Sequence, residues 1–262
     1  EMGRNIDETG IQFRVLNMKK GPAVRSSRAQ ADKDLYKQRM LRIIMEQEGL
    51  DLKQGMVEEI VVEDGKICGI IADTGMLYRS EKVILCTGTF LKGLIHIGDC
   101  HYQAGRMNEF ASVNMSASLA KAGFRLERLK TGTPARLDMA TINFSSLDTH
   151  HGDEFAKPFS FETKEILLPQ LPCYVTYTNE NTHKIIRDNL HRSPLYSGVI
   201  KGIGPRYCPS IEDKVKKFPE KIRHQIFLEP EGLNSREYYA NGFSSSLPVD
   251  VQIAMYRTVE GL

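Results

Sequence analysis

Residues 57–78 read VEEIVVEDGKICGIIADTGMLY, and this stretch decides the fold. Two β-branched runs flank Asp64 and Gly65, and a third short run at residues 76–78 follows Gly75. An Asp-Gly pair between such runs is typical of a tight hairpin, because both central residues of that turn need positive φ. The stretch therefore predicts a three-stranded antiparallel meander with an exposed turn at Asp64 and Gly65.

An apolar run, KVILCTGT, follows the meander at residues 82–89. It predicts a buried parallel strand whose small terminal residues let a ligand approach closely. A helix is predicted over residues 112–122 with Gly123 at its C-terminal end, and residues 124–129 are predicted to return as a strand. Strands that alternate with helices indicate an α/β fold.

The rest of the chain is divided at about residue 134. Residues 1–30 are rich in Gly, Arg and Lys without a sustained period, which predicts a loop, and the pattern of residues 29–48 predicts a charged helix. Beyond residue 134 proline, polar and aromatic residues become frequent, which marks a domain boundary. The elements predicted there are a strand at residues 173–176, helices at residues 179–191 and 210–218, and the end of a helix at residues 254–262.

The composition excludes several classes of protein. Among 262 residues, 35 are Lys or Arg and 33 are Asp or Glu. The net charge of +2 excludes a strongly basic nucleic-acid binder but allows a local basic patch. No apolar run approaches the roughly 18 residues of a membrane helix, and no export signal follows Glu1. Five cysteines without C-x-x-C spacing argue against a disulfide framework or a zinc ribbon, so the chain is interpreted as a cytoplasmic fragment.

Cys208 stands out among the cysteines by its context. Ser210 is a good N-cap for the following helix, with Asp213 three residues on. The helix N-terminus and Arg206 would favour the thiolate and lower its pKa, which suits a nucleophile. A small buried hydrophobic residue is the alternative reading. The other four are expected to be unreactive, Cys68 and Cys86 because they are buried in strands, and Cys100 and Cys173 because they lack a helix N-terminus.

Other binding patterns are weaker. Residues 202–207 fail the dinucleotide fingerprint, because its third glycine would fall at Tyr207, although a phosphate could still bind the helix N-terminus. His150, His151 and Asp153 are a weak metal pattern and fit a polar loop better. Eight cations could contact an RNA backbone, but a solvated face has the same pattern: Lys19, Lys20, Arg25, Arg28, Lys33, Lys37, Arg39 and Arg42.

Longer motifs carry a family resemblance that covers nearly the whole chain. The meander followed by residues 83–91 resembles the interior of a glutathione-reductase-type FAD-binding domain. The chain further resembles the MnmG (GidA) family in QFR at 12–14, GPAVR at 21–25, RAQAD at 28–32, KTGTP at 130–134, GPRYCPSIEDK at 204–214 and FLEPEGL at 227–233. The fold so implied is the central part of a Rossmann-like FAD-binding domain over residues 1–133, with an inserted α/β domain over residues 134–262 that would bind NAD or substrate.

The resemblance implies an enzyme that adds a carboxymethylaminomethyl or aminomethyl group to carbon 5 of the wobble uridine of tRNA. It implies FAD, NADH and methylenetetrahydrofolate as cofactors, and tRNA, the GTPase MnmE and a second copy of the chain as partners. Flavin contacts map onto Val57 and Ser112, whose ordinary roles would be a strand residue and a helix cap. The dinucleotide segment maps onto Gly204, Pro205, Arg206, Tyr207, Cys208, Pro209, Ser210, Ile211, Glu212, Asp213, Lys214, Val215, Lys216, Lys217 and Phe218.

Within that resemblance Cys208 corresponds to a functional cysteine. It would either add to the pyrimidine ring as a thiolate or serve as a general acid or base. The glycine-rich FAD fingerprint and the helical domain that meets MnmE are absent, so the fragment is expected not to retain FAD fully. Two other readings stay open, namely a folate- and FAD-dependent tRNA uridine methyltransferase and a non-catalytic module that binds RNA or a partner.

Overall fold

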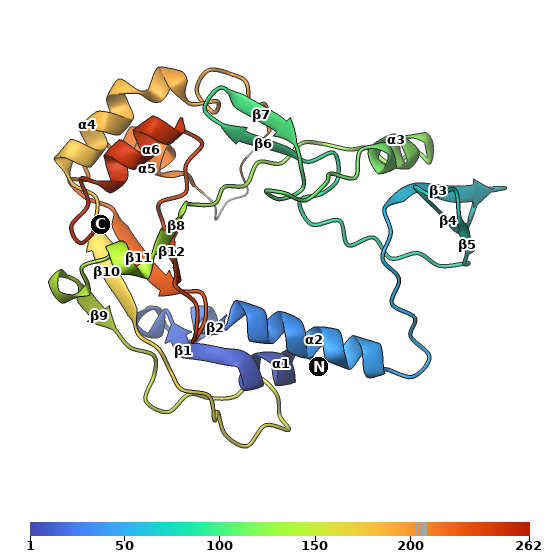
Figure 1. Cartoon of the computed structure of the whole chain (residues 1–262), viewed down its shortest axis with the longest axis horizontal. Coiled ribbons are helices and arrows are strands. Elements are labelled where there is room, and N and C mark those ends of the chain that lie inside the picture. Colours follow the sequence, from blue (N-terminus) through green and yellow to red (C-terminus); the bar gives the residue numbers. More distant parts are fainter. Residues whose placement is uncertain (203, 205–208) are drawn as a thin grey trace.

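The computed structural model describes residues 1–202, 204 and 209–262 (Figure 1). One body is built on a five-stranded sheet, and a three-stranded meander with one helix lies at the opposite side of Figure 1. Every named strand pairs antiparallel with its neighbour, so the fold is a mixture of helices and antiparallel sheets. Within the described ranges, no helix is both long and apolar enough to cross a membrane.

The five-stranded sheet has two chemically different faces. Ile226 and Leu228 are fully buried on one face, while Phe227 and Glu229 point to the other, because side chains alternate along a strand. Tyr174 and Ala240 pair with Leu228 and share its face. In spatial order the strands are β8 (Arg136–Asp138), β12 (Glu237–Asn241), β11 (Gln225–Pro230), β10 (Cys173–Tyr177) and β9 (Asp148–His150).

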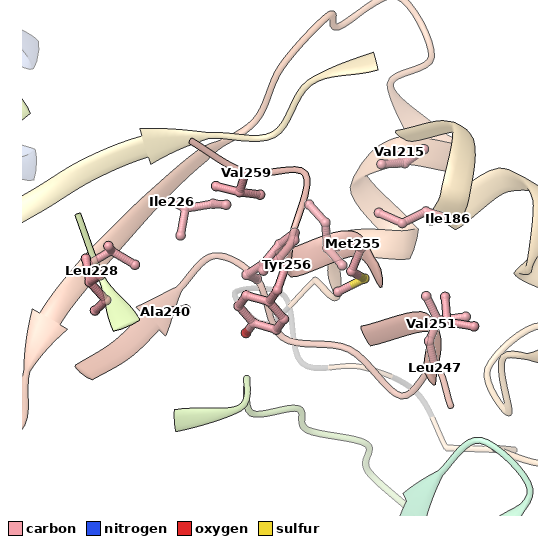
Figure 2. Packing of buried hydrophobic residues seen from close by; sticks show 13 residues of the cluster. Ile186, Val215, Ile226, Leu228, Ala240, Leu247, Val251, Met255, Tyr256 and Val259 are labelled. Carbon is pink, nitrogen blue, oxygen red and sulfur yellow. The ribbon is translucent and has the colours of Figure 1, made fainter. Parts of the chain in front are cut away.

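Three helices cover the apolar face. They are α4 (Glu180–Asp188), α5 (Ile211–Lys217) and α6 (Val249–Tyr256). Ile186, Val215 and Met255, one from each helix, join the sheet residues in one buried cluster (Figure 2). Asn179 caps α4 in a capping box, and the Ser210 hydroxyl accepts the Asp213 N–H at the start of α5.

The strand and the two helices predicted beyond residue 134 are therefore confirmed. The end of the chain differs from its prediction, since α6 ends at Tyr256 and residues 257–262 form turns. Short 3-10 turns complete the chain: η1 (Met18–Lys20), η2 (Pro22–Val24), η3 (Met139–Thr141), η4 (Phe144–Ser146) and η5 (Leu190–Arg192).

The N-terminal residues form regular structure, so the predicted loop over residues 1–30 is wrong. They form α1 (Met2–Thr9) and a hairpin of β1 (Gly10–Leu16) and β2 (Ser26–Ala31). The helix predicted from residue 29 is α2 (Lys33–Glu46), which starts later because Asp32 caps it by accepting the N–H groups of Asp34 and Leu35. β1 is specified by its pairing with β2, which no local period reveals.

The β1–β2 hairpin is joined to the five-stranded sheet. The side-chain amide of Gln12 donates to the carbonyls of His150 and Leu171, at 3.1 and 3.0 Å. The backbone of β1 accepts the N–H groups of Leu171 and Asp153. β1 therefore lies against β9 and the segments next to the sheet, while the domain division at residues 133 and 134 stays a prediction.

The predicted meander is confirmed. It consists of β3 (Val57–Glu63), β4 (Lys66–Ala72) and β5 (Leu77–Arg79), with α3 (Asn114–Lys121) against β3. Asp64 and Gly65 take φ of 49° and 74° and are exposed, as the tight turn requires. The helix predicted over residues 112–122 is α3, which is followed by Gly123 with φ of 94°.

Two predicted strands are wrong. Residues 82–89 and 124–129 contain no named strand, and Ile84 is 88% exposed. An apolar run becomes a strand only when a neighbour supplies hydrogen bonds, and the described part of the chain supplies none to residues 83–86. A short hairpin of β6 (Leu94–Ile97) and β7 (Cys100–Gln103), which the sequence did not predict, lies between these segments.

Substitutions on α6 test which face of that helix stabilises the body. Met255 is fully buried and Ile253, on the same helix, is 46% exposed. We expect Met255→Ala to lower the free energy of unfolding by about 2–5 kcal/mol, because it removes buried methylenes and leaves a cavity. Ile253→Ala should cost less than about 1 kcal/mol. Urea unfolding measures both, and equal losses would contradict the assigned core.

Candidate functional site

Val57 and Ser112, both predicted to contact flavin, lie in direct contact. The Ser112 hydroxyl donates to the Val57 carbonyl at 3.3 Å. The Ser112 backbone is also fixed, since its N–H donates to the Phe90 carbonyl at 2.9 Å and its carbonyl accepts the Lys92 N–H at 2.7 Å. Residues 55 positions apart are thus brought together where the meander meets the turn at residues 90–92.

The helix after Ser112 is anchored on the meander. Ile60 of β3 forms a small buried cluster with Met115 and Leu119 of α3. The Ser118 hydroxyl accepts the Ile60 N–H at 2.9 Å. These contacts fix α3 on β3, so they also fix Ser112 opposite Val57.

A glycine keeps the neighbouring turn tight. A Cβ at Gly93 would lie 2.5 Å from the Ala104 carbonyl oxygen and 2.6 Å from that of Thr89. No side chain fits at those distances, so the backbone passes closely there. The Thr89 hydroxyl donates to the Gly105 carbonyl at 2.7 Å and closes the same turn.

The predicted dinucleotide segment lies in the other body, and it is described in part. Pro205, Arg206, Tyr207 and Cys208 lie outside the described residues, so the proposed environment of the Cys208 thiol is not tested. Its helix is described in full as α5, whose inner face packs Ile211 and Val215 into the core. The opposite side of α5 carries the ion pair of Asp213 with Lys217 and leaves Lys216 exposed.

A hollow of about 440 Å³ lies beside α5. Side chains from three segments meet there, since the end of α5 faces the start of β11 and the end of β12. The Lys214 ammonium donates to the Gly242 carbonyl at 2.9 Å. The lining residues are Pro209, Lys214, Phe218, His224, Gln225, Phe227, Asn241 and Gly242.

The hollow combines cationic, aromatic and amide groups. Burial, followed by the neighbouring His183 ring and Lys214, lowers the pKa of His224 and favours its neutral form. The buried Nε2 of His224 has no hydrogen-bond partner within the described ranges. A flat polar ligand with negative charge would match these groups, with rings available at Phe218 and Phe227.

Glu212 is a buried carboxyl group. The sequence analysis named it only as one residue of the proposed dinucleotide segment. It is fully buried, and its Oε1 accepts the Ser246 N–H at 3.0 Å, the Ser246 hydroxyl at 3.1 Å and the Ser193 hydroxyl at 3.5 Å. It therefore ties α5 to two loops. An acidic residue in a first helical turn is ordinarily exposed beside the helix dipole, so the local sequence carries no signal of this role.

The two predicted contact regions are separate in this structure. The meander with α3 lies on one side of Figure 1, and α5 with the five-stranded sheet lies on the other. The residues that sequence reasoning missed in the hollow come from β11, β12 and the turn before β11. The short apolar run of Ile226, Phe227 and Leu228 is the local signal that could have predicted β11.

The His150 region is a polar contact between elements. Asp153 accepts the Val15 N–H at 2.7 Å, and His150 lies beside the Arg14 guanidinium. Burial, with the positive charges of Arg14 and Arg28, lowers the pKa of His150. Across the residues that the structure describes, no three His, Cys, Asp or Glu side chains are grouped to hold a metal ion.

Comparison with known proteins identifies the family. The sequence model described as "Glucose inhibited division protein A" matches residues 1–262. The chain belongs to the GidA family. It is 60% identical over all 262 residues to the "tRNA uridine 5-carboxymethylaminomethyl modification enzyme MnmG" of Geobacter sulfurreducens, and 53% identical to the protein of that name from Bacillus licheniformis. It spans 42% of the length of each.

A solved structure of the GidA family has the same fold. The protein titled "Structure of Aquifex aeolicus GidA in the form I crystal" is 51% identical, with a TM-score of 0.92. The match covers all of this chain and 45% of that one. The second crystal form of the same protein gives a TM-score of 0.90.

The described cysteines of this GidA chain differ from their predicted environments. Cys86 is exposed and lies in no strand, and Cys68 of β4 is half-buried, so the expectation of two buried thiols there is wrong. Cys173 is the buried one, and its thiol donates to the Gln30 side-chain carbonyl at 3.1 Å. Burial, followed by the Glu229 charge, raises the pKa of Cys173 to about 11.

Glu212 gives a stability test of the α5 anchor. We expect Glu212→Ala to lower the free energy of unfolding by about 1–3 kcal/mol, because the Ser246 N–H and hydroxyl lose their buried acceptor. Glu212→Gln keeps an acceptor oxygen and should cost less. Glu220→Ala, at an exposed position shortly after α5, is the matched control. If urea unfolding shows equal losses of free energy of unfolding for Glu212→Ala and Glu220→Ala, the role of Glu212 in holding α5 is contradicted.

The raised pKa of Cys173 predicts a pH dependence. An unfolded thiol ionises near pH 9, whereas the folded one ionises at about 11, so protons leave the unfolded state first. Cys173 therefore contributes stability that is full below pH 9 and is lost as the pH rises toward 11. The loss in the wild type should exceed that in Cys173→Ser when unfolding is measured at pH 8, 9.5 and 10.5. Parallel pH profiles would disprove the assignment.

Proposed function

We propose that this chain forms part of an enzyme that adds a carboxymethylaminomethyl or aminomethyl group to carbon 5 of the wobble uridine of tRNA. The observation that carries the proposal is the match of all 262 residues, at 60% identity, to a relative named for that modification. The chain spans only 42% of that relative's length. The activity of the whole enzyme is therefore a proposal for this chain. A cytoplasmic location, a homodimer and the GTPase MnmE as partner belong to the same proposal.

Val57 and Ser112 are the proposed flavin contacts. Their geometry fits this role, because a half-buried hydroxyl and a strand edge meet beside a tightly closed turn. FAD would supply hydride chemistry when bound. A Rossmann-like FAD-binding domain over residues 1–133 belongs to this proposal. The glycine-rich diphosphate fingerprint is not among these 262 residues.

The hollow beside α5 is the proposed contact for NADH. Its volume lies within the range of about 300–1,000 Å³ that is typical of small-molecule sites. Lys214 provides positive charge for a phosphate, and Phe218 and Phe227 provide faces for a flat ring. NADH would supply reducing equivalents, and methylenetetrahydrofolate the one-carbon unit. Residues 204–218 would hold the dinucleotide.

Cys208 is the proposed catalytic thiol. Its position two residues before the N-cap Ser210 supports a lowered pKa, and a thiolate that adds to a pyrimidine ring makes carbon 5 nucleophilic. A thiol of that acidity also transfers protons. Either chemistry requires the sulfur atom.

A serine variant tests the thiol. In the full-length protein we expect Cys208→Ser to abolish modification of the wobble uridine while flavin absorbance stays unchanged, because the side chain keeps its approximate size. Cys100→Ser, at an exposed position in β7, is the matched control. The measurement is nucleoside analysis of tRNA from cells that carry each variant.

Normal modification by Cys208→Ser would disprove the role of the thiol. Loss of a methyl group from the T-loop, in cells that lack the protein, would instead support the uridine methyltransferase. An unchanged nucleoside profile in those cells would disprove the enzymatic proposal.

A further inference from the structure

The β1–β2 hairpin concentrates positive charge. Residues 10–31 contain five cations and no Asp or Glu: Arg14, Lys19, Lys20, Arg25 and Arg28. Apart from these, 30 basic residues remain against 33 acidic ones, so the rest of the chain has a formal charge of −3. The hairpin is therefore a basic feature on an otherwise slightly acidic chain.

Two of these cations face each other directly. Arg14 and Arg28 are Cα partners in the β1–β2 ladder, where like charges are destabilising. Glu229 accepts from Arg28 at 2.6 Å and offsets one of them. Arg14 has no carboxylate within ion-pair distance among the described residues, and it lies against His150, whose pKa is lowered. The hairpin thus keeps an excess of positive charge despite its cost to folding.

The cations at the tip are exposed and also lack carboxylate partners. Lys19, Lys20 and Arg25 form no ion pair within the part of the chain that is described, and Arg25 donates to the Met18 carbonyl at 3.1 Å. In contrast, Lys33 and Arg39 on the adjoining α2 each contact two glutamates. Lys37 and Arg42 on α2 are exposed too and form no ion pair in the described structure, but only the cations of the hairpin tip are grouped on one turn.

The tip is shaped by its own hydrogen bonds. The Asn17 side chain donates to the Val24 carbonyl at 3.1 Å, and the Lys20 N–H donates to the Asn17 carbonyl at 2.9 Å. Gly21 takes φ of 91°, which turns the chain between the two lysines and Arg25. The three cations are therefore presented together on a closed turn.

We propose that the tip of the β1–β2 hairpin, defined by Lys19, Lys20 and Arg25, binds the phosphate backbone of the tRNA substrate. This inference rests on the proposed function, which supplies the polyanion. Exposed cations without carboxylate neighbours gain most from phosphates, because no internal ion pair has to be broken. The contact is electrostatic and independent of base sequence, so it would position the tRNA while other groups recognise the uridine.

Neutralising the tip tests this inference. In the full-length protein, the triple variant Lys19→Ser, Lys20→Ser, Arg25→Ser should weaken binding of unmodified tRNA at least about tenfold at 0.1 M salt. It should also reduce the slope of log K against log salt by about 2–3, because about three phosphate contacts are lost. The matched control neutralises three exposed lysines that form no ion pair in the described structure, namely Lys66, Lys157 and Lys164.

The outcomes separate the inference from the function on which it rests. Wild-type affinity and salt slope in the tip variant would overturn the hairpin contact, and so would equal losses in the tip and control variants. Failure of the wild-type protein to bind tRNA would instead overturn the proposed function. Flavin absorbance and thermal unfolding of the tip variant should match the wild type, since the one bond that these exposed side chains make in the described structure runs from Arg25 to the Met18 carbonyl within the tip. If the tip variant loses tRNA binding and also unfolds at a different temperature, the result counts against the inference. The charge-preserving triple variant Lys19→Arg, Lys20→Arg, Arg25→Lys would reverse that conclusion by restoring binding.

Discussion

The five-stranded sheet has to be covered on both faces, and the two faces require different partners. Ile226 and Leu228 place an apolar surface under α4, α5 and α6, where burial from water drives packing. The opposite face carries Cys173, Phe227 and Glu229, which contact the polar side chains of the β1–β2 hairpin or its neighbours. Burial there is tolerated because the polar groups bond to one another.

Polar contacts also stabilise α1 at the start of the chain. Asn5, Asp7 and Thr9 are buried although they are polar. Each one is used: Thr9 donates to the Asn5 carbonyl at 2.6 Å, and Asp7 accepts two N–H groups, from Phe159 and Ser160. These bonds replace those that the buried polar groups of α1 would make with water.

The sequence predicts correctly those features that depend on residues close together in the chain. The Asp64-Gly65 turn and the Ser210 cap depend on residues within four positions, and both were predicted correctly. β1 was missed because its partner β2 and its polar contacts lie elsewhere in the chain. The apolar run at residues 83–86 was predicted as a strand for the opposite reason, since its hydrophobicity is local while its hydrogen-bond partners are not.

The candidate site follows the same division. The contact of Ser112 with Val57 and the buried acceptor at Glu212 both join distant segments, and neither can be read from spacing. The hollow beside α5 is likewise formed where α5 meets the ends of β11 and β12. The family resemblance pointed to Ser112 and to the segment that contains Glu212 without explaining either, because their contacts arise only in the folded chain.

The hairpin then has to satisfy two demands at once. Its inner side chains must be polar enough to bond with the second face of the sheet, as Gln12 and Gln30 do beside Cys173. Its tip is exposed, and Lys19, Lys20 and Arg25 form no ion pair in the described structure. Arg28 bonds to the second face of the sheet through its ion pair with Glu229, whereas Lys19 and Lys20 are exposed at the tip. A single two-stranded element can therefore close the body and present positive charge to a polyanion, because burial governs one end of it and solvent the other.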